Sequence, residues 1–192
     1  MSFVAFLSYV IITSITPGPS NIILMNEARS FGFIGSWRFI SGILAGFAVL
    51  GIMSGLFTTG LYNFIPIVEP YFKVAGVIYL LYLAWQVGLN KSSAESTNNM
   101  HSSFLSGFIF QIINVKSILF FLSVMSAFIL PFHDSLEFVA IYLALTIFLG
   151  WLALLLWSGF GSIFKSIFAK HDKSFRLIMC LMLIYSAVSI FL

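Results

Sequence analysis

Charged residues are scarce in this sequence of 192 residues, which has nine Lys and Arg and six Asp and Glu, or 8% of the chain. Soluble domains carry about 25% charged and about 45–50% apolar residues, whereas 60% of the residues here are hydrophobic. A soluble fold of this length could not cover its surface with so few polar groups. The deficit excludes an ordinary cytosolic domain, a disordered chain and a nucleic-acid-binding protein. The remaining class is an integral membrane protein.

Cysteine and intramembrane acidic residues are also lacking. Cys180 is the only cysteine, which excludes an internal disulfide and a cysteine-based metal site. No Asp or Glu falls in the middle of a long apolar stretch, so a proton relay made of carboxylates is not expected. The histidines lie in connecting segments, and no nucleophile has a base at a useful spacing. We therefore predict no catalytic residues, no metal and no cofactor, and a protein that is not an enzyme.

Six apolar stretches are long enough to cross a bilayer as helices, for which about 20 residues are needed. They are continuously apolar rather than alternating, which favours helices over transmembrane strands. The predicted spans are 3–24, 39–60, 69–89, 104–129, 136–157 and 175–192. The predicted fold class is an all-α integral membrane protein with six transmembrane helices, in which residues 1–192 form a single transmembrane domain.

Basic residues predict the orientation of the spans, because Lys and Arg collect in cytoplasmic connections. The connections on one side hold seven of them, namely Arg29, Arg38, Lys91, Lys165, Lys170, Lys173 and Arg176. The connections on the opposite side hold only Lys73. We predict that the richer side is cytoplasmic and that both termini face outward.

The polar segment 91–103 divides the chain into two sets of three spans and reads as a linker. Because three is odd, two similar halves would insert with opposite orientations. The first span of each half is interrupted, at residues 16–21 (TPGPSN) and 111–116 (QIINVK). Paired interruptions of this kind predict two inverted three-helix repeats, about 1–90 and 104–192, with a transport site near the midplane. The alternative is two unrelated irregular helices.

The first interruption combines two prolines with a glycine. Proline removes a backbone donor and disfavours helical geometry in the residue before it. We therefore expect a half-helix, an unwound step, and a second half-helix that begins near Pro19. The new N-terminus would suit a carboxylate, and Ser20 and Asn21 would add polar partners. The alternative is a kink that serves only packing.

Lys116 lies near the centre of the fourth span, close to Gln111 and Asn114. A lysine at the centre of a span costs about 2.5–3.5 kcal/mol on insertion scales. Buried in a cavity, its ammonium could bind a carboxylate, and because burial penalises the charged form, the amine could also exchange a proton. The alternative is a lysine that snorkels to the cytoplasmic surface. The candidate substrate-binding residues are Pro17, Gly18, Pro19, Ser20, Asn21, Gln111, Asn114 and Lys116, and Lys116 is also the candidate proton-coupling residue.

Glycines recur in the second span at a spacing that lets helices approach closely, as Gly42 with Gly46 and Gly51 with Gly55. We interpret them as close packing within the monomer. If Gly42 and Gly46 instead formed a docking face, the chain would be a non-transporting membrane subunit or scaffold of a larger complex.

The two interruptions, with the segments 32–46 and 107–121 around them, resemble the LysE/RhtB amino-acid exporter family over the whole chain. Most members have Asn-Pro-Lys at the second interruption, where this chain has Val115. This departure, the segment 108–111 and the ending 183–188 are similar to the cysteine/O-acetylserine exporter subgroup. The resemblance implies a secondary active exporter of small neutral amino acids in the bacterial inner membrane, with cysteine/O-acetylserine-like substrates, proton exchange and periplasmic termini.

The partners that follow from these predictions are a small zwitterionic amino acid, a proton and the lipid bilayer. No nucleic acid is expected, and association into a homo-oligomer is left open. Rocking of one half against the other would open the cavity to alternate sides of the membrane.

Overall fold

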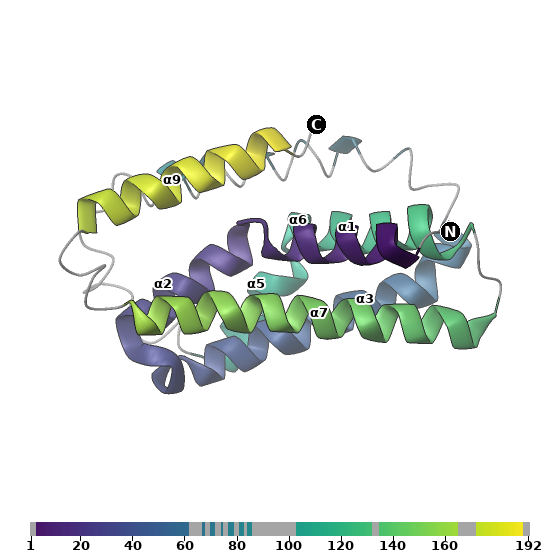
Figure 1. The fold of residues 1–192 in the computed structure, drawn as a ribbon, viewed down its shortest axis with the longest axis horizontal. Helices are drawn as coiled ribbons and strands as arrows, with labels where there is room; N and C mark the ends of the chain where they lie inside the picture. The colour runs from purple at the N-terminus through teal and green to yellow at the C-terminus, as the bar shows by residue number, and fades with distance from the viewer. Residues whose placement is uncertain are drawn as a thin grey trace.

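The computed structural model describes residues 3–61, 103–131, 135–164 and 172–189, and isolated positions between 67 and 85. These residues are helical apart from short turns, and none of them lies in a strand (Figure 1). The helices are α1 (Phe3–Ile15), α2 (Pro19–Gly35), α3 (Trp37–Leu61), α5 (Phe104–Ile112), α6 (Val115–Ser123), the π-helix η1 (Val124–Ile129), α7 (Leu136–Ile163) and α9 (Asp172–Ser189). The all-α prediction is confirmed for this part of the chain.

Two single helices are long and apolar enough to cross a membrane, over Trp37–Phe57 in α3 and over the whole of α7. Two helix pairs pass the same test together but are bent, by 47° between α1 and α2 and by 54° between α5 and α6–η1. Counting each pair as one span gives four, at the predicted first, second, fourth and fifth positions. The helix α9 covers most of the predicted sixth span but does not pass this test. The third span, 69–89, and the linker fall largely or wholly outside the described residues, so six spans remain a prediction.

The helix of the first span is longer than predicted. We expected the span to end at Leu24, but α2 continues to Gly35 because no proline or glycine interrupts it before Gly32. Gly32 has a φ of 75°, a left-handed conformation that favours glycine, and it kinks α2 close to its end. Glu27, beyond the predicted end of the span, is buried within this longer helix.

The first span runs parallel to α7. Near the start of both, the ring of Phe6 packs on the ring of Tyr142, with centroids 4.8 Å apart. Near the end of both, the backbone carbonyl of Met25 lies so close to Gly161 that a side chain at Gly161 would collide with it. The broken span of the first half therefore packs along the long helix of the second half.

The fourth span runs parallel to α3 in the same manner. A side chain at Gly42 would collide with the carbonyl of Phe104, and one at Gly107 would collide with the carbonyl of Phe39. Further along, a Cβ at Gly51 would lie 2.9 Å from the ring of Phe121. The prediction that these glycines serve packing within the monomer is confirmed, because α5 covers the face that would otherwise dock a partner.

The long helices α3 and α7 cross in opposite directions. The indole Nε1 of Trp151 donates to the carbonyl of Leu44 at 2.9 Å, while Gly55, later in α3, lies against Leu143, earlier in α7. The span α1–α2 runs parallel to α7, and the span α5–α6 runs parallel to α3. The two broken spans therefore also run in opposite directions. Among the described residues, the first two spans of one half thus run in the opposite direction to the first two spans of the other.

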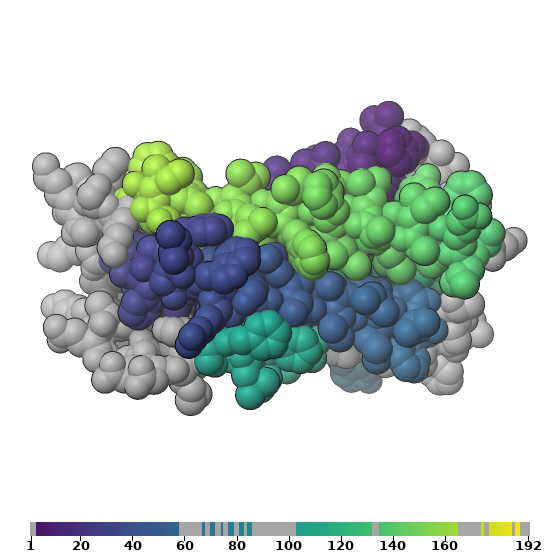
Figure 2. All heavy atoms as spheres, turned by 90° about the horizontal axis from the view of Figure 1, so that it is seen from below, coloured from purple at the N-terminus to yellow at the C-terminus, as the bar shows by residue number. Residues whose placement is uncertain are grey.

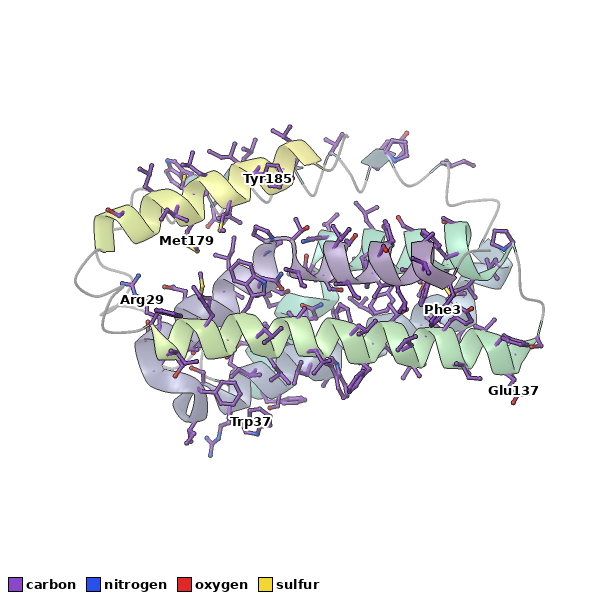
Figure 3. All side chains as sticks on the ribbon, viewed as in Figure 1. Phe3, Arg29, Trp37, Glu137, Met179 and Tyr185 are labelled. Carbon is purple, nitrogen blue, oxygen red and sulfur yellow. The ribbon has the colours of Figure 1, made fainter. Side chains whose placement is uncertain are left out.

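The outer face of this bundle is apolar, as expected of helices in lipid. In the space-filling view α3 lies between α7 and α5 (Figure 2). Large hydrophobic side chains project outward, with Ile34 89% and Val4 70% exposed. On this outer face charge stays near the ends: Arg29 lies at one end of the bundle, and Glu137 lies at the other (Figure 3).

Candidate substrate-binding site

The first break lies between α1 and α2, at residues 16–18. The last helical hydrogen bond of this half-helix joins the amide of Thr16 to the carbonyl of Ile12 at 2.9 Å. The prolines then stop the helix, and α2 begins with Pro19 in its first turn, where a missing N–H loses nothing. The predicted half-helix, unwound step and second half-helix are confirmed.

The second break lies between α5 and α6, and a side chain organises it. Asn114 caps α6, since its Oδ1 accepts from the backbone N–H of Lys116 at 3.1 Å. Its φ of −70° and ψ of 103° are extended rather than helical. Val115, which stands where the family usually has proline, is the first residue of α6. The span is therefore interrupted without a proline.

Lys116 joins the two breaks. Its Nζ donates to the carbonyl of Thr16 at 2.6 Å and to the carbonyl of Pro17 at 3.3 Å. Its aliphatic chain lies over Gly18, where a Cβ would be 2.5 Å from Cδ and 2.9 Å from Nζ. Carbonyls at the end of a half-helix carry partial negative charge, so an ammonium is the group that suits them. The amine thus contacts the first break and does not extend to an end of the bundle.

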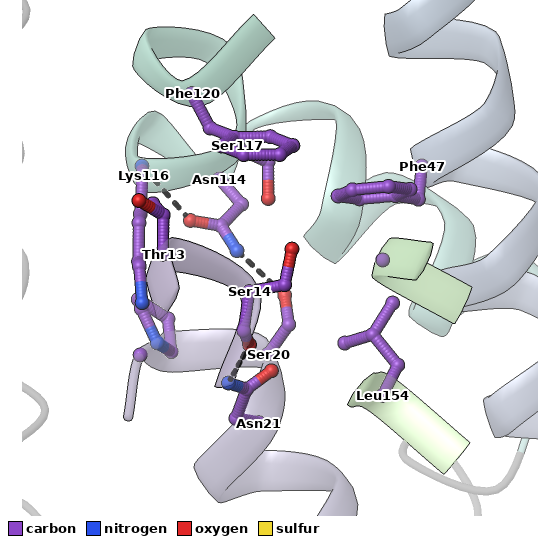
Figure 4. A pocket seen from close by; sticks show the side chains of 13 residues that line it. Thr13, Ser14, Ser20, Asn21, Phe47, Asn114, Lys116, Ser117, Phe120 and Leu154 are labelled. Atoms are coloured by element: carbon purple, nitrogen blue, oxygen red, sulfur yellow. Dashed lines mark hydrogen bonds between the residues drawn. The ribbon is translucent and has the colours of Figure 1, made fainter. Parts of the chain in front are cut away.

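A chain of buried side-chain hydrogen bonds runs beside Lys116. The Nδ2 of Asn114 donates to the Oγ of Ser20 at 2.5 Å, and the Oγ of Ser20 donates to the Oε1 of Gln111. The Nε2 of Gln111 then donates to the Oγ of Ser117 at 2.8 Å. All four residues are buried. This chain connects polar residues separated by more than 90 positions and holds the two breaks side by side (Figure 4).

Asn21 supports the first break from within. Its Nδ2 donates to the carbonyls of Ser14 and Thr16, both at 3.0 Å. Carbonyls freed by an interrupted helix need donors where no water is available. Asn21 and Lys116 together supply them, which explains why the broken span is tolerated.

A small cavity opens between the breaks, with a volume of about 40 Å³. That is room for about three water molecules, so the cavity admits only a small solute. Its lining residues are Thr13, Ser14, Gly18, Pro19, Ser20, Asn21, Phe47, Asn114, Lys116, Ser117, Phe120, Gly150 and Leu154. One side of the cavity is polar and the other is apolar (Figure 4).

Unused donors face the polar side. The Oγ of Ser14 is buried and has no hydrogen-bond partner in the described part of the structure. The backbone N–H groups of Ser20 and Asn21 start α2, so no earlier carbonyl of that helix can accept from them. Together they offer hydroxyl and amide donors to an anionic group.

Six of the eight predicted site residues line the cavity, namely Gly18, Pro19, Ser20, Asn21, Asn114 and Lys116. The other two lie behind it: the carbonyl of Pro17 accepts from Lys116, and Gln111 is fully buried against Ser20 and Ser117. The lining residues that sequence reasoning missed are Thr13, Ser14, Phe47, Ser117, Phe120, Gly150 and Leu154. Ser14 and Ser117 each lie within a turn of a break, which was a usable signal. In the described ranges no cluster of His, Cys, Asp and Glu could hold a metal ion.

Apolar helices that cross a membrane, two of them broken around a shared polar cavity, define a membrane carrier. A family model described as LysE type translocator matches residues 11–192. The chain belongs to this family of transporters.

Curated relatives extend the match to nearly the whole chain. The cysteine/O-acetylserine efflux proteins of Escherichia coli strain K12 and Shigella flexneri serotype 5b are each 30% identical to it over 187 residues. The alignments cover 97% of this chain and 96% of each relative. No solved structure matches this protein.

Proposed function

We propose that this protein is a secondary active exporter of small neutral amino acids, with cysteine/O-acetylserine-like substrates and a proton as the exchanged ion. The observation that carries the proposal is the convergence of two broken spans on one small cavity around Lys116. The similarity to cysteine/O-acetylserine efflux proteins supports the substrate class. The bacterial inner membrane is the location that follows.

The cavity has groups for both ends of a zwitterion. The substrate carboxylate contacts the free N–H groups at the start of α2, or the amine of Lys116, which still donates an N–H after it has lost its proton. Asn21 and Asn114 hold the polar remainder, and Gln111 orients Asn114 through Ser20. Among the described residues that line the cavity there is no Asp or Glu, which disfavours cationic substrates such as lysine.

Lys116 provides a route for proton coupling. When protonated, its amine satisfies the carbonyls of Thr16 and Pro17. When the proton leaves to water on the cytoplasmic side, fewer donors remain, and these carbonyls can accept from the ammonium of a substrate instead. A proton from the outside then displaces the substrate ammonium when the cavity opens outward. One proton therefore moves inward for each zwitterion that moves out.

The proposed architecture has six spans in two inverted three-helix repeats, joined by the linker 91–103. The opposite directions of the first two spans of each half support it. The excess of basic residues on one predicted side supports periplasmic termini. A C-terminal reporter that is active only in the cytoplasm would contradict this orientation.

The experiment that tests the proposal is transport by the purified protein in proteoliposomes. Labelled cysteine, O-acetylserine, threonine and lysine are compared, with and without a proton gradient. We expect movement of the first two, lost when the gradient is collapsed. Movement that is indifferent to the gradient would indicate a uniporter. No movement of any substrate would favour a non-transporting subunit or scaffold.

Mutants connect the transport to the breaks. We expect Lys116→Met to abolish gradient-driven export, and the double variant Pro17→Ala/Pro19→Ala to reduce it. Full export by both would exclude the mechanism while leaving the transport function in place.

A further inference from the structure

One hydroxyl of the cavity is not used by the proposed binding of the zwitterion. The Oγ of Ser14 is buried and has no hydrogen-bond partner among the described residues. The hydroxyls of Ser36 and Ser158 also lack a partner there, but neither residue lines the cavity. The charged groups of the substrate are bound by the start of α2, by Lys116 and by the carbonyls of the first break. The hydroxyl of Ser14 is therefore left for the substrate side chain.

The Ser14 hydroxyl also does not turn back on its own helix. Hydroxyls within helices often donate to a carbonyl one turn earlier, and Thr16 does so, to the carbonyl of Ile12 at 2.7 Å. Ser14 makes no such bond. Its side chain instead points toward the space between Ser117 and Phe47, which both line the cavity (Figure 4). The hydroxyl is thus presented to a ligand.

The position of Ser14 is fixed relative to the first break. Its carbonyl accepts from the Nδ2 of Asn21 at 3.0 Å, so α1 is held to the first turn of α2 at this point. Ser14 precedes Thr16 by two residues, which is about 3 Å along the helix axis. In an amino acid the γ atom is two bonds from the α carbon. A substrate whose charged groups lie at the break therefore brings its γ atom close to this hydroxyl.

We propose that the hydroxyl of Ser14 binds the sulfur or oxygen of the substrate side chain and thereby selects polar over apolar side chains. This inference rests on the proposed export function and deepens it. Cysteine carries a thiol, which is a weak donor, and O-acetylserine carries an ester, which is an acceptor. A hydroxyl has one donor and two acceptor sites and rotates to present either, so one residue serves both substrates whatever the length of the side chain. A side chain made only of carbon leaves the hydroxyl unsatisfied, which disfavours its binding.

The test measures export from proteoliposomes, in reducing buffer, for two matched pairs of amino acids. α-Aminobutyrate has a methyl group where cysteine has its thiol, and norleucine has the chain length of O-acetylserine without the side-chain oxygens. We expect the wild type to prefer the polar member of each pair. Ser14→Ala should reduce both preferences by about two- to tenfold, as expected for one hydrogen bond. Because alanine removes the unsatisfied hydroxyl, transport of α-aminobutyrate and norleucine should stay the same or rise.

The melting temperature of the purified protein gives a second readout, which does not depend on transport. A ligand that binds the folded state stabilises it according to its affinity. We expect cysteine to raise the melting temperature of the wild type more than α-aminobutyrate does, and the two to act equally on Ser14→Ala.

Two control variants should keep the wild-type preferences. Ser8→Ala makes the same change on the same helix at an exposed position. Gly159→Ala adds a methyl group on α7 at a position where a Cβ meets nothing within 4 Å.

The outcomes separate the two proposals. If the wild type moves none of the four amino acids, the export function fails. If the wild type moves cysteine and O-acetylserine but shows no preference within the pairs, or if Ser14→Ala keeps that preference, the role of Ser14 is wrong and the export function stands. An equal loss of all four substrates in Ser14→Ala would also refute the contact, because it would make Ser14 a purely structural residue. If Ser14→Ala transports too slowly for a comparison, the melting temperatures with cysteine and α-aminobutyrate decide between the same outcomes.

Discussion

The two breaks bend their spans by similar angles, 47° and 54°, but are built by different means. The first, at residues 16–18, is set by the backbone: prolines flank a glycine, and α2 begins after Gly18 with no side-chain cap. The second, at Ile113 and Asn114, contains no proline, and the amide of Asn114 caps the next helix. A break can therefore be produced either by residues that disfavour a helix or by one residue whose side chain caps a new helix.

The difference predicts unequal sensitivity to substitution. A proline break survives the loss of any one hydrogen bond, because the ring excludes helical geometry in the residue before it. A capped break depends on one side chain, whose loss lets the span approach a continuous helix. Lys116 stands outside this contrast, because it belongs to the second break but donates hydrogen bonds to the carbonyls of Thr16 and Pro17 in the first.

The largest effect is expected from Lys116→Met, which removes the donor shared by both breaks. The carbonyls of Thr16 and Pro17 lose that donor, and an unsatisfied buried polar group is worth about 1–3 kcal/mol. We expect export to fall at least about tenfold, equivalent to about 1.4 kcal/mol. The measurement is proton-driven efflux from proteoliposomes. Lys116→Arg keeps the charge but cannot release a proton, so it should lose proton-driven efflux as fully as Lys116→Met, and retained efflux in Lys116→Arg would show that Lys116 does not carry the proton.

Gly18→Ala tests how closely the first break fits the lysine of the second. Gly18 has a φ of −155°, which any residue adopts, so only the new Cβ matters. It would lie 2.5 Å from Cδ of Lys116 and displace the amine from its carbonyls. We expect a severalfold loss of export, smaller than that of Lys116→Met because the amine remains present. Gly159→Ala should leave export unchanged, and an unaffected Gly18→Ala would refute the close fit.

Asn114→Ala tests the capped break directly. Loss of a helix cap costs about 1 kcal/mol, within a range of about 0.5–2, so the thermal stability of the purified protein should fall. Ser20→Ala is the matched control, since it breaks the same Asn114–Ser20 hydrogen bond but removes no cap. Ser20→Ala also loses the hydrogen bond from Ser20 to Gln111, so a larger loss of stability in Asn114→Ala would be due to the cap. If Asn114→Ala leaves the stability unchanged, the second break does not depend on Asn114 as a cap.

The smallest effect is expected from Val115→Pro, which converts the capped break into a proline break. The residue is first in α6, a position that favours proline, and Asn114 before it is already extended. We expect stability and export close to those of the wild type. Ile118→Pro, three residues later, removes the hydrogen bond from its amide to the carbonyl of Asn114 at 3.1 Å and should cost about 3 kcal/mol. A harmful Val115→Pro would mean that the valine side chain has a role of its own.

The sequence predicted both breaks and most of the polar site for a clear physical reason. Proline, amide and ammonium groups are costly inside an apolar span, so their positions carry information. Apolar residues carry little, because a lipid-facing and an inward-facing phenylalanine look alike in a chain that has 23 of them. Phe47 and Phe120 could therefore be assigned to the cavity only from the structure. The end of the first span was placed too early, at residue 24, because the polar residues that follow Leu24, Glu27 among them, do not distinguish a helix that continues from one that ends.

The direction of the glycine contacts has a consequence for which parts of the molecule can move as units. The carbonyl of Met25 in α2 lies against Gly161 in α7, and the carbonyl of Phe104 in α5 lies against Gly42 in α3. In both contacts the glycine has no side chain, so the two helix backbones touch. Rocking one sequence half against the other would separate both contacts. Sliding the body α1–α2–α7 past the body α3–α5–α6 preserves them. The contacts that change are the α3–α7 crossing, the hydrogen bonds of Ser20 with Gln111 and Asn114, and the amine of Lys116 on the first break. The moving units are then made of helices taken from both halves, so cutting the chain between its repeats would not release a mobile domain.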